Sequence, residues 1–116
     1  MISSIRQAGN YKILDISEPV RKYEDITAIK DAIDDLMNNN VTCIALNVAN
    51  IDFMHSYFIK ILTSTYKKLK SRSGDLCLIG PNEFIRNLMK LLNIDEFIGS
   101  YPNENRFREE LNLPPA

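Results

Sequence analysis

Three residues with reactive side chains stand together near the middle of the chain: His55, Ser56 and Tyr57. With Asp52 shortly before them, they supply the residue types of a hydrolytic triad. In such a triad the base approaches the nucleophile while a third group orients the base from behind. Residues packed into one short loop do not easily reach that geometry. We therefore expect no catalytic residue among them, and no enzyme.

The patterns of metal and cofactor sites are missing. His55 is the only histidine, and Cys43 and Cys77 are too far apart for a zinc-binding Cys-x-x-Cys motif. Gly74 and Gly80 stand alone in turns and do not form a phosphate-binding loop. We expect no metal and no cofactor. Both cysteines lie in apolar runs, and without a visible export signal buried reduced thiols are favoured over a disulfide.

Ser56 begins a run with helical periodicity, and two roles are open for its hydroxyl. As an N-cap, it would accept a hydrogen bond from an otherwise unpaired backbone amide. As a phosphoacceptor, it would place about two negative charges at the positive end of the helix dipole. Such a group would cost the fold little and would repel an acidic partner surface. His55 is then an exposed loop residue or a reserve cap.

Alternating strand and helix patterns surround this site. Strand patterns cover residues 2–7, 11–16, 41–48, 75–79 and 94–101. Helical patterns cover residues 26–37, 56–71, 82–92 and 103–111. A Gly-Asn turn joins the first two strands into an antiparallel hairpin. The order predicts an α/β fold: a single domain over residues 1–116, with a mixed four- to five-stranded sheet layered with about four helices.

Local signals also predict the ends and the buried faces of these helices. Asp25 and Asn103 are the expected N-caps of the first and last helices, and Pro81-Asn82 is expected to open the third. The expected inner positions of the second helix are Ile59, Leu62, Tyr66 and Leu69. Those of the third helix are Phe84 or Ile85, Leu88, Leu91 and Leu92.

Size and charge exclude several classes of function. The chain has 116 residues, of which 45% are hydrophobic and 25% charged, and its formal net charge is -1. This balance gives no electrostatic support for binding nucleic acid or an anionic membrane surface. No apolar run approaches the roughly 20 residues that span a bilayer. With no signal peptide visible at the N-terminus, we expect a cytoplasmic domain.

The run from Cys43 to Ile59 resembles the centre of STAS domains, the anti-sigma factor antagonist family. Two later stretches, Gly74 to Gly80 and Leu92 to Phe97, are similar to the family's glycine turn with its strand and to its acidic-aromatic ending. The resemblance covers nearly the whole chain. It implies a protein partner, an ATP-dependent serine kinase that doubles as an anti-sigma factor.

The family's signature at the helix start is Asp-Ser-Ser-Gly-Leu, and phosphorylation of its second serine abolishes partner binding. Here the corresponding residues are His55, Ser56, Tyr57, Phe58 and Ile59. Only Ser56 and the apolar Ile59 agree with the family pattern. A serine kinase cannot modify Tyr57 in the usual geometry, because the phenol oxygen lies farther from the backbone. We therefore expect phosphoregulation at the usual serine to be lost.

Two interpretations of Tyr57 and Phe58 stay open. Turned inward, they fill the core. Exposed, two adjacent aromatic rings form an interface hot spot, and Phe58 adds a large group where glycine lets a partner backbone approach. The predicted partner-binding surface comprises Asp52, His55, Ser56, Tyr57 and Phe58.

Two rival functions keep the same fold. Ser56 is the candidate phosphoacceptor, one position early in the motif. Alternatively, the chain is an accessory subunit of an anion or lipid transport system, because STAS-like domains also occur with such transporters.

Overall fold

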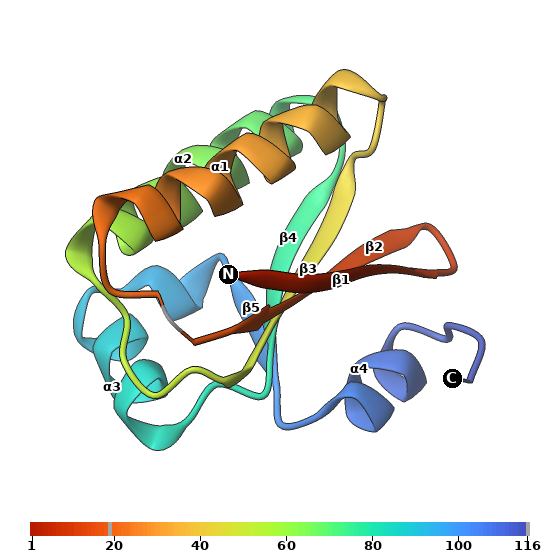
Figure 1. Ribbon diagram of the computed structural model, residues 1–116. Helices are drawn as coiled ribbons and strands as arrows, with labels where there is room; N and C mark the ends of the chain where they lie inside the picture. The colour runs from red at the N-terminus through yellow and green to blue at the C-terminus, as the bar shows by residue number, and fades with distance from the viewer. Residues whose placement is uncertain (19, 116) are drawn as a thin grey trace.

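A mixed five-stranded sheet, in the spatial order β1-β2-β3-β4-β5, runs through the centre of the molecule (Figure 1). The computed structural model describes residues 1–18 and 20–115. The strands are β1 (Ile2–Ala8), β2 (Tyr11–Ser17), β3 (Cys43–Asn50), β4 (Asp75–Ile79) and β5 (Gly99–Tyr101). The helices are α1 (Tyr23–Asn38), α2 (Ser56–Ser71), α3 (Glu83–Leu91) and α4 (Glu104–Glu110), with the short 3₁₀ helix η1 (Ile94–Glu96).

The predicted order of elements and the predicted hairpin are confirmed. β1 pairs antiparallel with β2 around a tight turn in which Gly9 has a φ of 58°. β2, β3, β4 and β5 then pair in parallel, which requires the helices as crossovers. The last predicted strand is shorter than expected. Its first half forms η1 because Asn93 adopts a left-handed conformation, with φ 58°, and turns the chain.

The sheet separates two hydrophobic layers. α1 and α2 lie together on one face, and α4 lies on the other (Figure 1). The larger core includes Ile44 and Leu46 of β3, whereas Cys43 and Ala45 belong to the smaller core with Phe107 of α4. This alternation is the two-residue period of a strand buried on both faces. It explains why β3 is almost continuously apolar.

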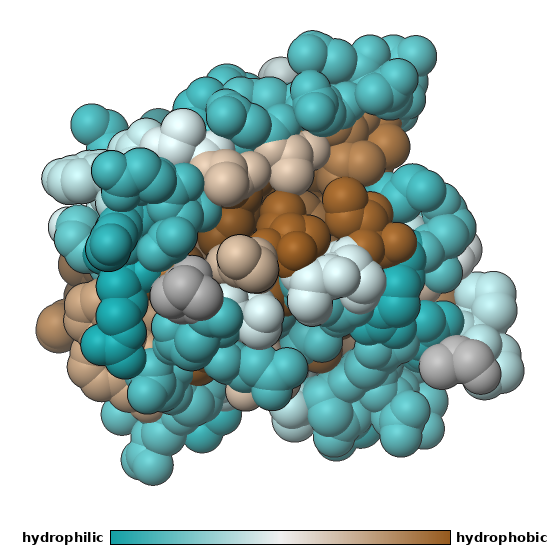
Figure 2. All heavy atoms as spheres, viewed as in Figure 1, coloured by the Kyte–Doolittle hydropathy of each residue, from teal (hydrophilic) through white to brown (hydrophobic). Residues whose placement is uncertain are grey.

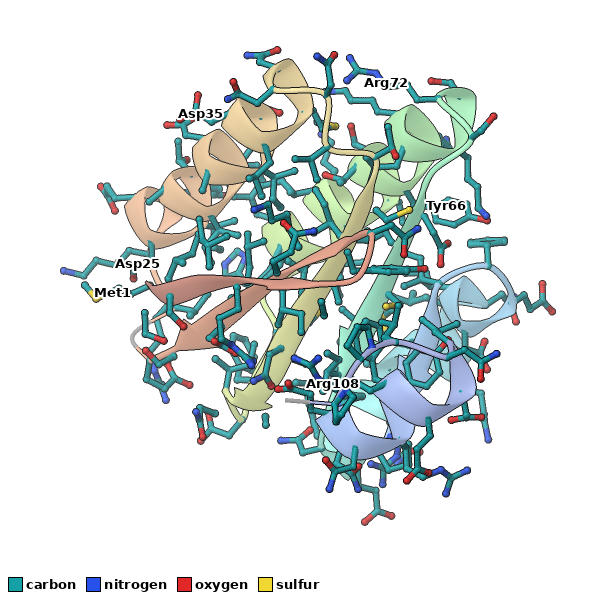
Figure 3. The ribbon with its side chains drawn as sticks, turned by 90° about the vertical axis from the view of Figure 1, so that its right-hand side faces the viewer. Met1, Asp25, Asp35, Tyr66, Arg72 and Arg108 are labelled. Atoms are coloured by element: carbon teal, nitrogen blue, oxygen red, sulfur yellow. The ribbon has the colours of Figure 1, made fainter. Side chains whose placement is uncertain are left out.

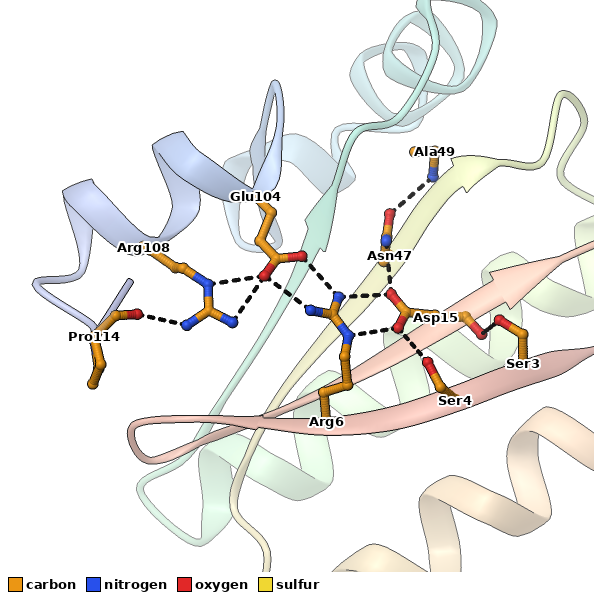
Figure 4. Close-up of polar contacts among 9 residues, drawn as sticks. All are labelled: Ser3, Ser4, Arg6, Asp15, Asn47, Ala49, Glu104, Arg108 and Pro114. Atoms are coloured by element: carbon orange, nitrogen blue, oxygen red, sulfur yellow. Dashed lines mark hydrogen bonds and ion pairs between the residues drawn. The ribbon is translucent and has the colours of Figure 1, made fainter. Parts of the chain in front are cut away.

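Charged side chains fasten α4 to the hairpin (Figure 4). The guanidinium of Arg6 donates to Asp15 through Nε at 2.6 Å and to Glu104 through Nη2 at 2.7 Å. Glu104 also accepts from Nε of Arg108 at 2.8 Å, and Arg108 donates to the carbonyl of Pro114 at 2.5 Å. The hydrogen bond from Arg6 is the main cause that lowers the pKa of Asp15 to about 2. The same guanidinium lowers the pKa of Glu104.

Several predicted helix details are confirmed and others are wrong. Asn103 caps α4 as expected, and Asn82, at the predicted opening of the third helix, caps α3. Asp25 is not the N-cap of α1, because the helix starts earlier, after Lys22. Asp25 is its third residue, and its carboxylate accepts hydrogen bonds from the backbone amides of Arg21 and Lys22. The acidic side chain therefore closes the helix start from inside the first turn.

The predicted inner faces of α2 and α3 are only partly correct. In α2, Leu62 and Leu69 are buried as expected, but Ile59 and Tyr66 lie at the margin of the core. The buried residues of α2 are Phe58, Ile61, Leu62, Thr65 and Leu69. In α3, Ile85 and Met89 are buried, while Leu91 remains 78% exposed and Phe84 and Leu92 are exposed as well. The predicted Leu88 is partly buried and packs against the larger core, so only a narrow side of α3 faces inward and Phe84, Leu91 and Leu92 face outward.

Both cysteines are buried and free, so the predicted reduced thiols are confirmed. Burial raises the pKa of the Cys77 thiol and keeps it protonated. Across residues 1–18 and 20–115, no helix is both long and apolar enough to cross a bilayer.

Candidate functional site

The loop between β3 and α2 places the motif residues at one end of the sheet. Ile51 and Met54 are buried and anchor this loop, while Asp52 and Phe53 between them are exposed. The backbone carbonyl of Asp52 accepts a hydrogen bond from the side chain of Asn82, the residue that caps α3, at 3.1 Å. The starts of α2 and α3 are therefore tied together through this loop.

His55, not Ser56, is the N-cap of α2, and this corrects the predicted cap. His55 has an extended backbone, and its Nδ1 accepts a hydrogen bond from the backbone amide of Tyr57 at 3.1 Å. The imidazole therefore takes the capping role through a ring nitrogen, as a serine or aspartate oxygen does at other helix starts. Ser56 is the first helical residue, and its side chain is exposed. Its hydroxyl is therefore not needed to close the helix.

Tyr57 and Phe58 point in different directions, so the choice between an inward and an exposed ring has a different answer for each residue. Phe58 is fully buried and belongs to the larger core, so it does not lie on the surface and does not belong to the predicted contact surface. Tyr57 is half-buried, and its ring packs against Tyr23 of α1 with 4.9 Å between ring centroids. Through this contact, the side chain of Tyr57 in α2 packs against the start of α1.

A row of aromatic rings crosses the surface around the start of α2, and we call it the aromatic row. It consists of Tyr57, Tyr23, His55, Phe53 and Phe84, in that spatial order. Successive ring centroids lie 4.9, 5.6, 6.5 and 6.3 Å apart. Three of its members are well exposed: Tyr23 at 64%, Phe53 at 41% and Phe84 at 51%. Exposed aromatic rings that touch one another in this way are typical of protein-binding surfaces.

The sequence did not single out Tyr23, Phe53 or Phe84 as members of a site. These residues come from the first residue of α1, the loop before α2 and the first turn of α3. The signal that could have found them is their position beside predicted helix starts, since the starts of α1, α2 and α3 gather at one end of a parallel sheet.

Charged groups border the aromatic row. Asp52 is exposed and lies 3.9 Å from the guanidinium of Arg21, which lies at the same distance from Glu18. Pairs this long and exposed contribute little to stability, so the charges stay available to a partner. The carboxylate of Asp52 faces Arg21, and Nδ1 of His55 is occupied by a backbone amide. Asp52, His55 and Ser56 therefore do not form a catalytic relay.

No group of three or more His, Cys, Asp or Glu residues that could hold a metal ion occurs in the part of the chain that the structure describes. Every buried polar side-chain atom in that part has a hydrogen-bond partner. The site is therefore a surface of rings and charges, and its geometry suits contact with another macromolecule.

The chain belongs to the STAS domain family, whose sequence model matches residues 3–107. A protein of Thermotoga maritima described as a "Putative anti-sigma factor antagonist" is 23% identical over 82 residues, which is 71% of this chain and 73% of that protein. A crystal structure of a Thermotoga maritima protein of the same description has a TM-score of 0.81 at 19% identity, covering 94% of this chain and 93% of the other.

The fold is also that of the anti-sigma factor antagonist SpoIIAA. Its unphosphorylated form matches with a TM-score of 0.78 at 13% identity, over 97% of this chain and 98% of that one. The phosphorylated form of this Bacillus cell fate determinant matches with a TM-score of 0.73 at 13% identity, over 91% and 96% of the two chains. At this level of identity the likeness shows a common fold, which confirms the predicted fold class.

Proposed function

We propose that this STAS domain is a non-enzymatic anti-sigma factor antagonist that binds a serine-kinase anti-sigma factor in the cytoplasm. Family membership and the description of the Thermotoga maritima relative support this role. The observation that carries the proposal for this chain is the aromatic row. Rings from three separate elements meet around the helix start that carries the family motif, and they stay exposed.

The proposed contact surface differs from the predicted one. The proposed surface keeps four of the predicted residues, at its rim and centre: Asp52, His55, Ser56 and Tyr57. Phe58 is buried in the core beneath this surface. The exposed aromatic rings of the proposed surface are those of Tyr23, Phe53 and Phe84. Large rings with few rotatable bonds lose little entropy on binding and bury much apolar area, so they carry much of the affinity of an interface.

We further propose that the usual phosphoserine switch is absent. Tyr57 occupies that position, and its ring is held against Tyr23. Phe58 replaces the neighbouring glycine and fixes the first turn of α2 in the core. A phosphoryl group would therefore have no serine hydroxyl at the usual place. The exposed Ser56 carries the one serine hydroxyl of the motif, and a phosphate on it would lie beside the positive end of the helix dipole.

Calorimetric titration against the purified serine-kinase anti-sigma factor from the same organism tests the binding role. We expect Phe53→Ala and Phe84→Ala each to weaken binding by about tenfold or more, as truncation of an interface hot spot does. The matched control is Leu91→Ala, which removes an exposed apolar side chain from the far end of α3 and should change the affinity less than about twofold. Undiminished binding by the two ring variants, or no binding by the parent chain, would refute the proposal.

The missing switch is tested by incubation with the same kinase and ATP, followed by phosphopeptide mass spectrometry. We expect no phosphorylated species and unchanged affinity. Phosphorylation that Ser56→Ala abolishes would show that Ser56 is the phosphoacceptor and would contradict the proposal of an unregulated antagonist. Because binding and labelling are measured separately, either half of the proposal can fail alone.

A further inference from the structure

β1 forms one edge of the sheet, and half of its backbone groups face away from β2. In a two-residue hairpin, the pair beside the turn, here Ala8 and Tyr11, exchanges hydrogen bonds. The alternation of an antiparallel ladder then directs the N–H and C=O groups of Ile5 and Gln7 toward the open edge. Such an edge is a template for another extended chain.

An apolar groove of about 460 Å³ follows this edge, between β1 and α1. Its floor includes Ile2 and Ile5, and its wall includes Ala28 and Ala32 of α1. Ile5 is 46% exposed although its neighbour across the hairpin, Leu14, is fully buried. Figure 2 shows the resulting apolar patch, bounded by hydrophilic atoms of α1 above and of the hairpin below.

The wall that α1 contributes is acidic as well as apolar. Glu24 lines the groove, and Asp31 and Asp35 follow on the same helical face, spaced seven and eleven residues along α1. Figure 3 shows Asp35 on the outer side of α1. Among the ion pairs formed by residues 1–18 and 20–115, none uses Glu24, Asp31 or Asp35. Their charges are available to whatever fills the groove.

From these features we propose that the groove binds an extended segment of a partner protein, which adds to β1 as an antiparallel sixth strand. Its groove-facing side chains are apolar beside Ile5 and basic opposite Glu24 and Asp35. The backbone pairing supplies affinity, and the alternate side chains supply specificity. A bulge near Ser3 interrupts the ladder, so the paired stretch is the regular part of β1 from Ser4 to Ala8.

A second copy of this chain fits the groove poorly, for electrostatic reasons. Paired edge to edge, two copies would bring their acidic α1 helices to the same face of the joined sheet. The only basic residue of β1 is Arg6, and its guanidinium lies on the opposite face between Asp15 and Glu104. No side chain of the incoming β1 would then neutralise the acidic wall, and like charges facing each other oppose pairing.

The probe that tests this is a synthetic heptapeptide with blocked ends, Lys-Thr-Val-Thr-Ile-Thr-Lys. When it is extended, its lysine, valine and isoleucine side chains share one face. We expect it to shift the amide resonances of Ile5 and Gln7 in nitrogen-15 NMR spectra. The peptide with glutamate in place of lysine should bind about tenfold more weakly, because its charges repel the acidic wall. Equal affinities, or no shift at millimolar peptide, would overturn the proposal.

Backbone methylation separates strand addition from simple hydrophobic contact. In an antiparallel pair, the residues whose side chains face the groove also direct their amides to β1. N-methylation of the valine and isoleucine should therefore abolish binding, whereas N-methylation of two threonines should preserve it. The same loss with both peptides would show that no β-ladder forms.

Two variants complete the test. The charge swap Glu24→Lys with Asp35→Lys should reverse the preference and favour the glutamate peptide. Ile5→Lys should abolish peptide binding, while the matched control Leu91→Lys, at another exposed apolar residue, should not. Light scattering measures whether the parent chain forms a dimer through the groove. A dimer of the parent chain that becomes a monomer in the Ile5→Lys variant would overturn the proposal in favour of a second copy. Phe53→Ala should leave peptide binding unchanged, so this inference and the proposed function fail independently.

Discussion

Restoring the family glycine at position 58 should nearly unfold the protein. Phe58 is the second residue after the start of α2, yet it is fully buried and packs in the larger core. The substitution Phe58→Gly removes the whole ring and leaves a cavity between α2 and the sheet. In the family signature this position belongs to the phosphorylation site, but in this chain the structure makes it part of the core.

The expected cost follows from the burial. Truncating a buried phenylalanine to alanine costs about 3 to 5 kcal/mol, because both the transfer free energy and the cavity contribute. Glycine in place of alanine within a helix adds about 0.5 to 1 kcal/mol. The sum, about 3.5 to 6 kcal/mol, is comparable with the whole stability of the less stable domains, since domain stabilities run from about 5 to 15 kcal/mol. Phe58→Leu keeps most of the volume and should cost only about 1 to 1.5 kcal/mol.

Urea denaturation followed by circular dichroism measures these free energies of unfolding. The control is Phe53→Ala, which truncates an exposed ring only five residues earlier and should stay within about 0.5 kcal/mol of the parent. A loss below about 2 kcal/mol for Phe58→Gly would refute the reasoning, since a fully buried ring cannot be removed so cheaply from a rigid core.

Three further predictions concern the groups that hold the site in place. Because hydrogen bonds from Arg6 lower the pKa of Asp15 to about 2, folding gains stability above the ordinary aspartate pKa and loses it as the pH falls from about 4 to 2. Solvent exposure of Arg6 reduces the gain to about 1 to 2 kcal/mol, and Asp15→Asn should flatten this part of the stability curve in acid titrations. His55→Ala should cost about 1 kcal/mol in urea denaturation and Ser56→Ala less than about 0.5 kcal/mol, whereas equal costs would contradict the assignment of the cap. Gly74→Ala would place Cβ 1.8 Å from the carbonyl oxygen of Thr42, so the midpoint of thermal unfolding should fall by about 10 °C or more, and an unchanged midpoint would argue against this close approach.

The frame of the site could be predicted from the sequence because it depends on periodicity. β3 is apolar at nearly every position, and α2 repeats its buried residues every three or four positions. The start of α2 was correctly predicted at Ser56, but the cap was not. Serine is the stronger capping residue on average, and only the extended backbone at His55 brings Nδ1 within reach of the amide of Tyr57.

The aromatic row could not be predicted in the same way. Tyr23, Phe53 and Phe84 lie about thirty residues apart in the chain, and no local period connects them. Their meeting depends on the parallel order of β2, β3 and β4, which brings three helix starts to one end of the sheet. The same limit applies to Phe84 and Ile85, since the sequence offers both for the core and only the packing angle of α3 selects Ile85.

Three of the four motif residues from 55 to 58 have a structural role in the fold. His55 caps the helix, Tyr57 packs against Tyr23 of α1, and Phe58 anchors the first turn in the core. A switch works by changing a group that the fold does not need, because the change must not cost stability. Of the motif residues from 55 to 58, only Ser56 is both exposed and unnecessary for the helix cap. A modification within residues 55–58 that left the helix cap and the core intact would therefore have to fall on Ser56.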